Sequence, residues 1–442
     1  MMKRSLLSSC AAILLGAAPV LAQEKVAGIK ADPPVGGEVV FRFGSAAADD
    51  TETPRIEYSD RLGDKVASRE IHGIDRFAIN SDIQLETIRP VTADGDREES
   101  LVQAEGVDVA TYPQIGGDVI FRLGYDGAYD AETPRTESHD LFGVMIASPE
   151  IHLTERLAIN ADIRIETVRP PTADRYFEDH GLFVRSLYAE YAVGDRLSLQ
   201  AGKFTPTFAF ASMVTPGMYG NNYNKEIELI ERIGFGAEYT FNAGASGAHT
   251  LSAKTFFEDT SILSDSLGAR RGQRQLADGG ASNTESFESC TVALEGREIS
   301  WLPGFTYRLA YVHEAAGKGD VADENGFLVA VMQSFPLGDG QSLTLIGEIA
   351  PLWNFQGTAD NIIYTSAGLV YQDAPWTAIL SGTSRWREMA TGGTFDDYAV
   401  QASVEYDFGQ GTSLAIAHEF SRDRNVNSQR IGFRFNQVLD FD

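Results

Sequence analysis

The chain has 442 residues, of which 63 are acidic and 36 are basic, and its formal net charge is -27. This balance excludes nucleic acid as a partner, because phosphate binding needs clustered lysine and arginine and no basic stretch is present. The length suits one large barrel or two to three soluble domains. After the N-terminal region, no run approaches the roughly 18 apolar residues of a membrane helix. A membrane-spanning part would therefore have to consist of strands.

The N-terminus has the layout of a signal peptide. Lys3 and Arg4 precede an apolar stretch from Leu6 to Val20, and small residues suited to a signal peptidase end at Ala22. A lipoprotein signal at Cys10 fits less well, because almost no apolar stretch precedes that cysteine. We predict that residues 1–22 are removed and that the protein is exported.

The region after the signal peptide contains one internal duplication. GGEVVFRFG at Gly36 returns as GGDVIFRLG at Gly116, and RFAINSDIQLETIRP at Arg76 returns as RLAINADIRIETVRP at Arg156, an offset of 80 residues in both cases. Only the second copy runs directly into a strand-rich region. We therefore divide the mature chain into a duplicated segment with a linker at 23–106 and a strand-rich region at 107–442.

The strand-rich region predicts sixteen strands, most of them long enough to cross a bilayer when tilted, which needs roughly 9–11 residues. In DYAVQASVEYDF, apolar residues at Val400, Ala402 and Val404 alternate with polar Gln401 and Ser403. This period of two predicts strands with two different faces. The predicted strands are 117–124, 144–151, 156–168, 183–193, 195–204, 229–241, 249–258, 288–295, 305–314, 326–335, 341–353, 362–372, 375–384, 397–408, 412–420 and 427–441.

The connections favour a membrane barrel over a soluble sandwich. Short connections such as 194–195 alternate with long ones such as 259–287, which is the rim asymmetry of outer-membrane barrels. The last strand is apolar at every second position and ends in Phe441, followed only by Asp442. We predict an all-β fold, a transmembrane antiparallel β-barrel of about 16 strands. Eighteen to twenty strands is the alternative if the duplicated segment joins the wall.

The sequence offers no constellation for catalysis or metal binding. Seven histidines are scattered, without HExxH, CxxC, G-x-S-x-G or P-loop spacing. His418, on a strand near several serines, is the best candidate for a barrel enzyme of lipase or protease type. We predict no enzyme activity, no catalytic residue, no cofactor and no metal.

Charged residues on the polar strand faces are the candidates for a pore wall, because fixed charges on a wall select ions by sign. The alternative for each is that a water-filled barrel simply needs polar residues inside. The pore-wall candidates are Arg156, Asp162, Arg164, Glu166, Arg196, Arg308, Glu405, Arg430 and Arg434.

The connection 205–228 is the candidate for a constriction. It lies between the fifth and sixth predicted strands, and its glycines and asparagines permit tight turns. The alternative is an ordinary external loop. The constriction candidates are Lys203, Asn221, Asn222, Lys225, Glu226 and Glu228.

The segment LSLQAGKFTPTFAF, with LYAEYAVGDR before it, resembles the phosphate-selective porin family of Gram-negative outer membranes. The resemblance implies a sixteen-stranded barrel, commonly a trimer, that conducts small anions and whose third long loop folds inward. The net charge departs from an anion-selective pattern, and no dense ladder of arginine and lysine is present. We therefore expect a weak cation preference.

Together these features predict a passive porin in the outer membrane of a Gram-negative bacterium. We expect small hydrophilic solutes or ions to cross it, outer-membrane lipid and lipopolysaccharide to surround it, and a homotrimer to form. The alternatives are a barrel enzyme and a closed barrel with a structural or adhesive role.

Overall fold

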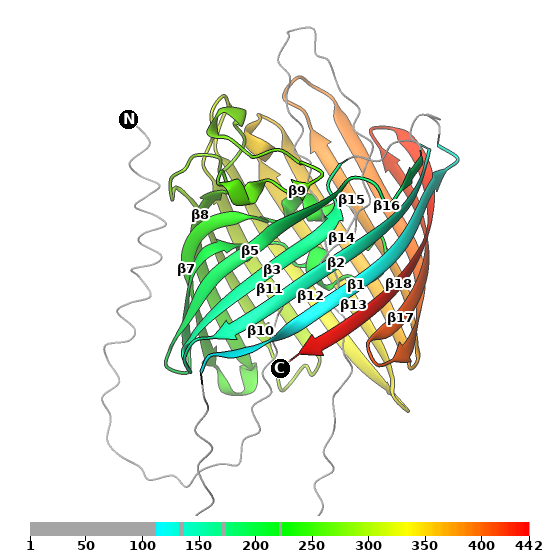
Figure 1. Ribbon diagram of the computed structural model, residues 1–442, viewed down its shortest axis with the longest axis horizontal. Coiled ribbons are helices and arrows are strands. Elements are labelled where there is room, and N and C mark those ends of the chain that lie inside the picture. The colour runs from blue at the N-terminus through cyan, green and yellow to red at the C-terminus, as the bar shows by residue number, and fades with distance from the viewer. Residues whose placement is uncertain (1–111, 132–136, 170–173, 221–222, 442) are drawn as a thin grey trace, which may run out of the picture.

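A computed structural model describes residues 112–131, 137–169, 174–220 and 223–441. The predictions for the signal peptide, the duplicated segment 23–106, Asn221 and Asn222 therefore lie outside the described residues. Figure 1 shows a barrel of tilted strands, in which the first strand and the last strand lie side by side. Among the described residues, no helix has the length and hydropathy that a membrane span requires.

Sixteen strands form the wall, and two very short strands, β4 and β9, pair at its edges. The sixteen predicted strands are all confirmed, with ends that differ by a few residues. The wall strands are β1 (Gln114–Tyr129), β2 (Ser138–His152), β3 (Leu157–Thr167), β5 (His180–Val193), β6 (Leu197–Phe204), β7 (Arg232–Asn242), β8 (Ala248–Glu258), β10 (Ser289–Arg297), β11 (Phe305–Glu314), β12 (Glu324–Gly338), β13 (Gln341–Trp353), β14 (Asn361–Asp373), β15 (Trp376–Glu388), β16 (Thr394–Gly409), β17 (Thr412–Asp423) and β18 (Val426–Phe441).

The wall is closed, because β1 pairs with β2 on one edge and with β18 on the other. The β1–β18 ladder is antiparallel and runs from Gly117 opposite Phe441 to Tyr129 opposite Gln429. Every wall strand is antiparallel to its neighbours, and the short β4 (Asp174–Tyr176) adds a parallel pairing to β2. Closure at sixteen strands rules out the alternative with eighteen to twenty.

The two strand faces differ as the sequence period predicts. On β16, Val400 and Val404 are 45% and 40% exposed and face outward, whereas Gln401 and Ser403 are buried and face the interior. On β18, Phe433 and Phe435 face outward and Arg434 lies between them facing inward. The outer face is therefore apolar, and the interior holds the charged side chains.

The start of β1 and the end of β18 lie at the same rim of the barrel, here called the terminus rim. The opposite rim is called the loop rim. Connections at the terminus rim are short, for example 194–196 and 410–411. Connections at the loop rim are longer between β1 and β14, up to 205–231 and 259–288. The predicted asymmetry fades at 389–393 and 424–425, because β15 to β18 extend further than their hydrophobic patterns indicate.

Candidate functional site

The connection between β6 and β7, residues 205–231, lies inside the barrel and is here called the internal loop. Its two ends are adjacent, because Phe204 of β6 pairs with Arg232 of β7. It contains the short helix α2 (Ala211–Val214) and the 3-10 turn η3 (Asn224–Ile227). Phe208 and Phe210 are only 1% and 3% exposed, so wall strands surround the loop.

The first anchor of the internal loop is on β11 and β13. The Oε2 atom of Glu348 accepts hydrogen bonds from the backbone N–H groups of Phe210 at 2.8 Å and Ala211 at 2.7 Å. Arg308 donates to the carbonyl oxygen of Ala209 and, at 2.8 Å, to Glu295. Hydrogen bonds to charged groups are about twice as strong as neutral ones, so this anchor fixes the start of the loop.

The second anchor is centred on Arg385 of β15. Its guanidinium donates to Glu226 of the internal loop at 2.6 Å, to Asp397 at 2.7 Å and to Asp423 at 2.6 Å. The Tyr364 hydroxyl donates to the other oxygen of Glu226 at 2.6 Å. The end of the loop is thereby held against β14 to β17. Three carboxylates share one arginine here, so removal of that arginine would leave them unbalanced.

The third anchor reaches the closure strands. Tyr219 donates to Asp126 of β1 at 2.9 Å, and its ring packs with Met218 on the alanines of β17. Gly432 of β18 leaves room for this contact, because a Cβ atom at that position would lie 2.4 Å from the tips of Met218 and Tyr219 and would push them aside. The internal loop thus crosses the interior from β6 and β7 to β18 and β1.

Apolar side chains of the internal loop pack against one half of the wall, from β8 to β16. The burial of a Phe, Leu or Ile side chain contributes about 1.5–3 kcal/mol, so this contact is a second hydrophobic core inside the barrel. The inward side chains in this core are Phe256, Ala293, Ala310, Val312, Leu328, Ala330, Ile346, Ala350, Leu352, Ile362, Tyr364, Val370, Ile379 and Ala399. Bulky apolar side chains therefore fill this half of the interior.

The inward side chains of the opposite half, toward the terminus rim, are mostly polar and include several carboxylates. Glu150 and Glu238 remain 24% and 30% exposed, although His152 and Lys254 lie 2.8 Å from their carboxylates. Glu190 accepts a hydrogen bond from Ser198 at 2.6 Å. The strands that carry Glu150, Glu190 and Glu238 are paired side by side in the order β2, β3, β5, β6 and β7, so the three carboxylates lie on one continuous part of the wall. Water therefore reaches an acidic strip on this side.

Most pore-wall candidates do face the interior. Arg164 of β3 pairs with Asp162 at 2.7 Å and lies 3.8 Å from Glu166. Arg308 belongs to the first anchor, and Arg430 and Arg434 face inward from β18, while Glu405 faces inward from β16. Six of the pore-wall candidates are buried: Asp162, Arg164, Glu166, Arg308, Arg430 and Arg434.

Two pore-wall candidates were misplaced. Arg156 and Arg196 are exposed residues of the short turns 153–156 and 194–196 at the terminus rim. The strands begin one residue after each arginine, so neither side chain has a wall position. The predicted strands 156–168 and 195–204 include residues of these turns, and in a turn the alternation does not indicate which side of the wall a side chain faces.

The constriction candidates separate into two groups. Glu226 and Glu228 lie inside the barrel, with Glu228 3.3 Å from Arg185 of β5, and Lys225 is buried in η3. Lys203 does not join them, because it shares the outward register of Leu187 and Ile233. It is buried in ion pairs at the edge of the wall instead. Sequence alternation alone would have shown that it points away from the interior.

Sequence reasoning missed Arg385 and Arg185. The predicted strand 375–384 stops one residue before Arg385, whereas β15 runs to Glu388. A register shift between β3 and β5, at Asp162 and Ile163, interrupts the alternation near Arg185. The candidate for enzyme chemistry, His418, faces outward and lies within hydrogen-bonding distance of Tyr129 and Gln429.

No family model matches the sequence, and no curated protein matches it. Among solved structures, OprB of Pseudomonas putida is similar with a TM-score of 0.54 and 10% identity, over 74% of this chain and 94% of that chain. The outer membrane channel DcaP of Acinetobacter baumannii has a TM-score of 0.48 and 12% identity, over 74% and 96%. At such identities the likeness concerns the fold. The chain therefore has the closed sixteen-strand barrel fold found in outer membrane proteins of Gram-negative bacteria.

Proposed function

We propose that this protein is a passive porin, through which small hydrophilic solutes or ions diffuse without catalysis. The internal loop narrows the path, and the acidic strip along β2 to β7 forms the wall of the remaining route. The observation that carries the proposal is the division of the interior. Three anchors and an apolar contact hold the loop against one half, while partly exposed carboxylates stay on the other.

Reconstitution in planar bilayers tests this proposal directly. Purified, heat-modifiable protein should give single-channel conductance steps, and pure folded protein without steps would contradict it. The variant Glu348→Ala removes the acceptor of two loop N–H groups, so its conductance should be larger or noisier. Glu388→Ala, at the exposed end of β15, is the matched control and should conduct as the wild type does.

The acidic strip supports a weak preference for cations. Fixed carboxylates at a narrow, low-dielectric wall concentrate cations and repel anions. The reversal potential in a salt gradient measures the sign of this preference, and a clear anion preference would contradict it. Phosphate selectivity, which the motif around Lys203 implies, gains no support from an interior in which Arg164, Arg308 and Arg385 lie in ion pairs with carboxylates.

The proposed assembly is a homotrimer in a bilayer with lipopolysaccharide in its outer leaflet. The exposed apolar outer face supports contact with lipid, since Leu380, Phe433 and Phe435 point away from the interior. Native mass spectrometry of the detergent-extracted protein would give the subunit number. A mass of one subunit throughout the protein concentration range would contradict the trimer.

A further inference from the structure

The wall has an incomplete segment next to β5. β6 ends at Phe204 where the chain turns inward, so its last pairing with β5 is Lys203 opposite Leu187. β5 itself continues to His180. On this edge of β5, residues 183–186 have no partner in the ladders of the described strands. A closed barrel normally leaves no such edge in lipid, because unpaired backbone groups are costly there.

The connection between β8 and β10, residues 259–288, covers this segment and is here called the closing loop. It contributes the two-residue strand β9 (Leu267–Gly268), which pairs with Leu182 and Gly181 of β5. Figure 1 shows the loop in green at the loop rim, with β9 beside β5. Two register pairs hold this part of the wall, whereas seven join β5 to β6. This part of the wall is therefore held by fewer backbone hydrogen bonds than the ladder between β5 and β6.

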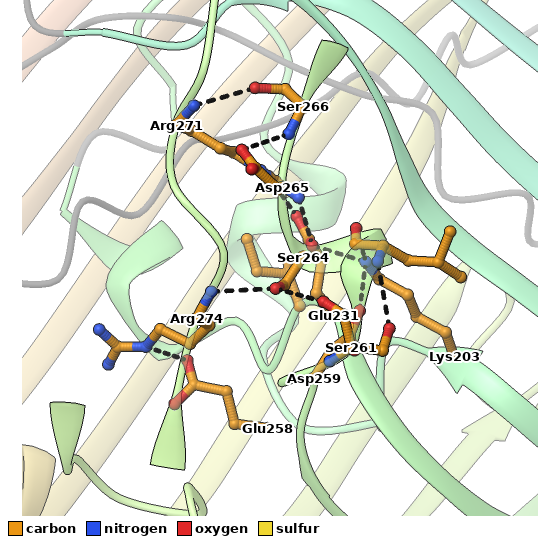
Figure 2. Close-up of polar contacts among 12 residues, drawn as sticks. Lys203, Glu231, Glu258, Asp259, Ser261, Ser264, Asp265, Ser266, Arg271 and Arg274 are labelled. Carbon is orange, nitrogen blue, oxygen red and sulfur yellow. Dashed lines mark hydrogen bonds and ion pairs between the residues drawn. The ribbon is translucent and has the colours of Figure 1, made fainter. Parts of the chain in front are cut away.

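Side-chain ion pairs fasten the closing loop instead. The Nζ atom of Lys203 lies 2.8 Å from Glu231 Oε2, from Asp259 Oδ2 and from the carbonyl oxygen of Leu263. Arg271 binds both oxygens of Glu231 at 2.7 Å. Figure 2 shows these side chains around the end of β6. The Lys203 side chain is 2% exposed, so the fastening is sealed from water while the loop is closed.

Apolar side chains flank the closing loop on both sides of the wall. Leu267 and Ile262 are 69% and 79% exposed on the loop, and Leu267 shares the outward register of Leu182. On the interior side, Phe183 and Phe204 are buried, and the Arg271 guanidinium lies 4.1 Å from the Phe183 ring. An apolar chain that passed here would contact Leu267 and Ile262 on the outer side and Phe183 and Phe204 on the interior side.

We propose that the closing loop is a lateral hatch, through which an amphipathic molecule with an acyl chain passes between the barrel interior and the outer leaflet. This is a second route, separate from the axial path of the proposed porin, and it takes the loop rim as the side of the barrel in the outer leaflet. Opening breaks two ladder pairs and the ion pairs of Lys203 and Arg271. The strands of the barrel keep their own ladders, so the wall stays folded.

A lipid-tethered maleimide in the bilayer tests lateral access. The reporter is Phe183→Cys, which faces the interior beneath the hatch, in a Cys290→Ala background that removes the native cysteine of the barrel. The matched reporter is Gln200→Cys, which faces the open half of the interior from a wall with ladders on both sides. We expect the lipid-tethered reagent to label the first reporter and not the second. Equal labelling of both, or labelling of neither, would overturn the hatch.

A second variant keeps the test decisive if the first reporter folds poorly. Tyr188→Cys, inward beside Phe204, serves as an alternative reporter. Arg271→Gln breaks the bidentate contact with Glu231 and should increase the labelling rate of either reporter, and no increase would overturn the proposal. Ion conductance of the same variants is recorded in parallel. Loss of conductance with lateral labelling intact would reject the porin alone, and normal conductance without labelling would reject the hatch alone.

Discussion

The two halves of the barrel wall obey one alternating pattern but place different chemistry inside. From β8 to β16, inward positions such as Ile346, Ala350 and Val370 are buried and apolar, and the internal loop packs on them. From β2 to β7, inward positions such as Glu150, Glu190 and Glu238 are polar and reach water. Alternation thus fixes which side chains face inward, whereas their polarity decides whether that side of the interior is filled or open.

The largest expected effect comes from the ion-pair cluster that joins the internal loop to the filled half. Arg385→Ala leaves Glu226, Asp397 and Asp423 without their shared cation. We expect a loss of about 3–5 kcal/mol in the free energy of unfolding and a larger conductance as the loop is released. Denaturant unfolding in detergent and bilayer recordings measure both.

Arg387→Ala is the matched control, because Arg387 is an arginine of the same strand paired with Asp360 and partly exposed. Its loss should be about 0–1 kcal/mol. Similar losses in the two variants would show that the Arg385 cluster does not hold the loop.

The apolar contact itself is tested by truncation. Ile346→Ala removes buried atoms between β13 and the internal loop, so the free energy of unfolding should fall by about 2–5 kcal/mol. Gln200→Ala, an inward residue of the open half, should change it by no more than about 0.5 kcal/mol. Thermal unfolding followed by heat-modifiable gel mobility compares the two variants. A larger cost for Gln200→Ala would reverse the assignment of filled and open halves.

Acid should weaken the fastening beside β6. Burial opposes the charge of Glu231, but the adjacent Arg271 and Lys203 outweigh it and lower its pKa to about 2. A lowered pKa stabilises the folded state in full above the ordinary value near 4.5, and this stability is lost as pH falls toward 2. The contribution is about 3 kcal/mol.

The check is a comparison of the wild type with Glu231→Gln by thermal unfolding between pH 6 and pH 2, the window set by the lowered pKa. The variant should be less stable at pH 6 and should lose less stability on acidification. Parallel curves for the two proteins would mean that Glu231 is not the titrating group.

The smallest expected change in stability accompanies a change in selectivity. Glu150→Gln combined with Glu190→Gln neutralises two carboxylates of the acidic strip without changing side-chain size. The free energy of unfolding should change by less than about 1 kcal/mol, whereas the reversal potential in a salt gradient should shift toward anions. Glu298→Gln, in an exposed turn at the terminus rim, is the control and should leave the potential unchanged. An unshifted double variant would remove the strip from the ion path.

The fold could be predicted because a strand period of two reports directly on the two faces, and each of the sixteen strands carries enough of that pattern. The interior could be predicted only in part. Asp162, Arg164 and Arg434 follow from parity, but Arg385 lies beyond the recognisable end of its strand. The contacts of the internal loop could not be predicted either, since Tyr219 binds Asp126, which lies 93 positions away in the sequence.

The closure of β1 on β18 has a consequence for the order of assembly. The internal loop touches Asp126 of β1 and Arg434 of β18, so its full set of contacts forms only when both end strands are present. The joining ladder links residues more than 290 positions apart, and contacts at such separation form slowly. The strand β18 therefore both closes the wall and completes the surroundings of the internal loop, and a chain truncated before β18 would leave the wall open and the contact between Arg434 and the loop unmade.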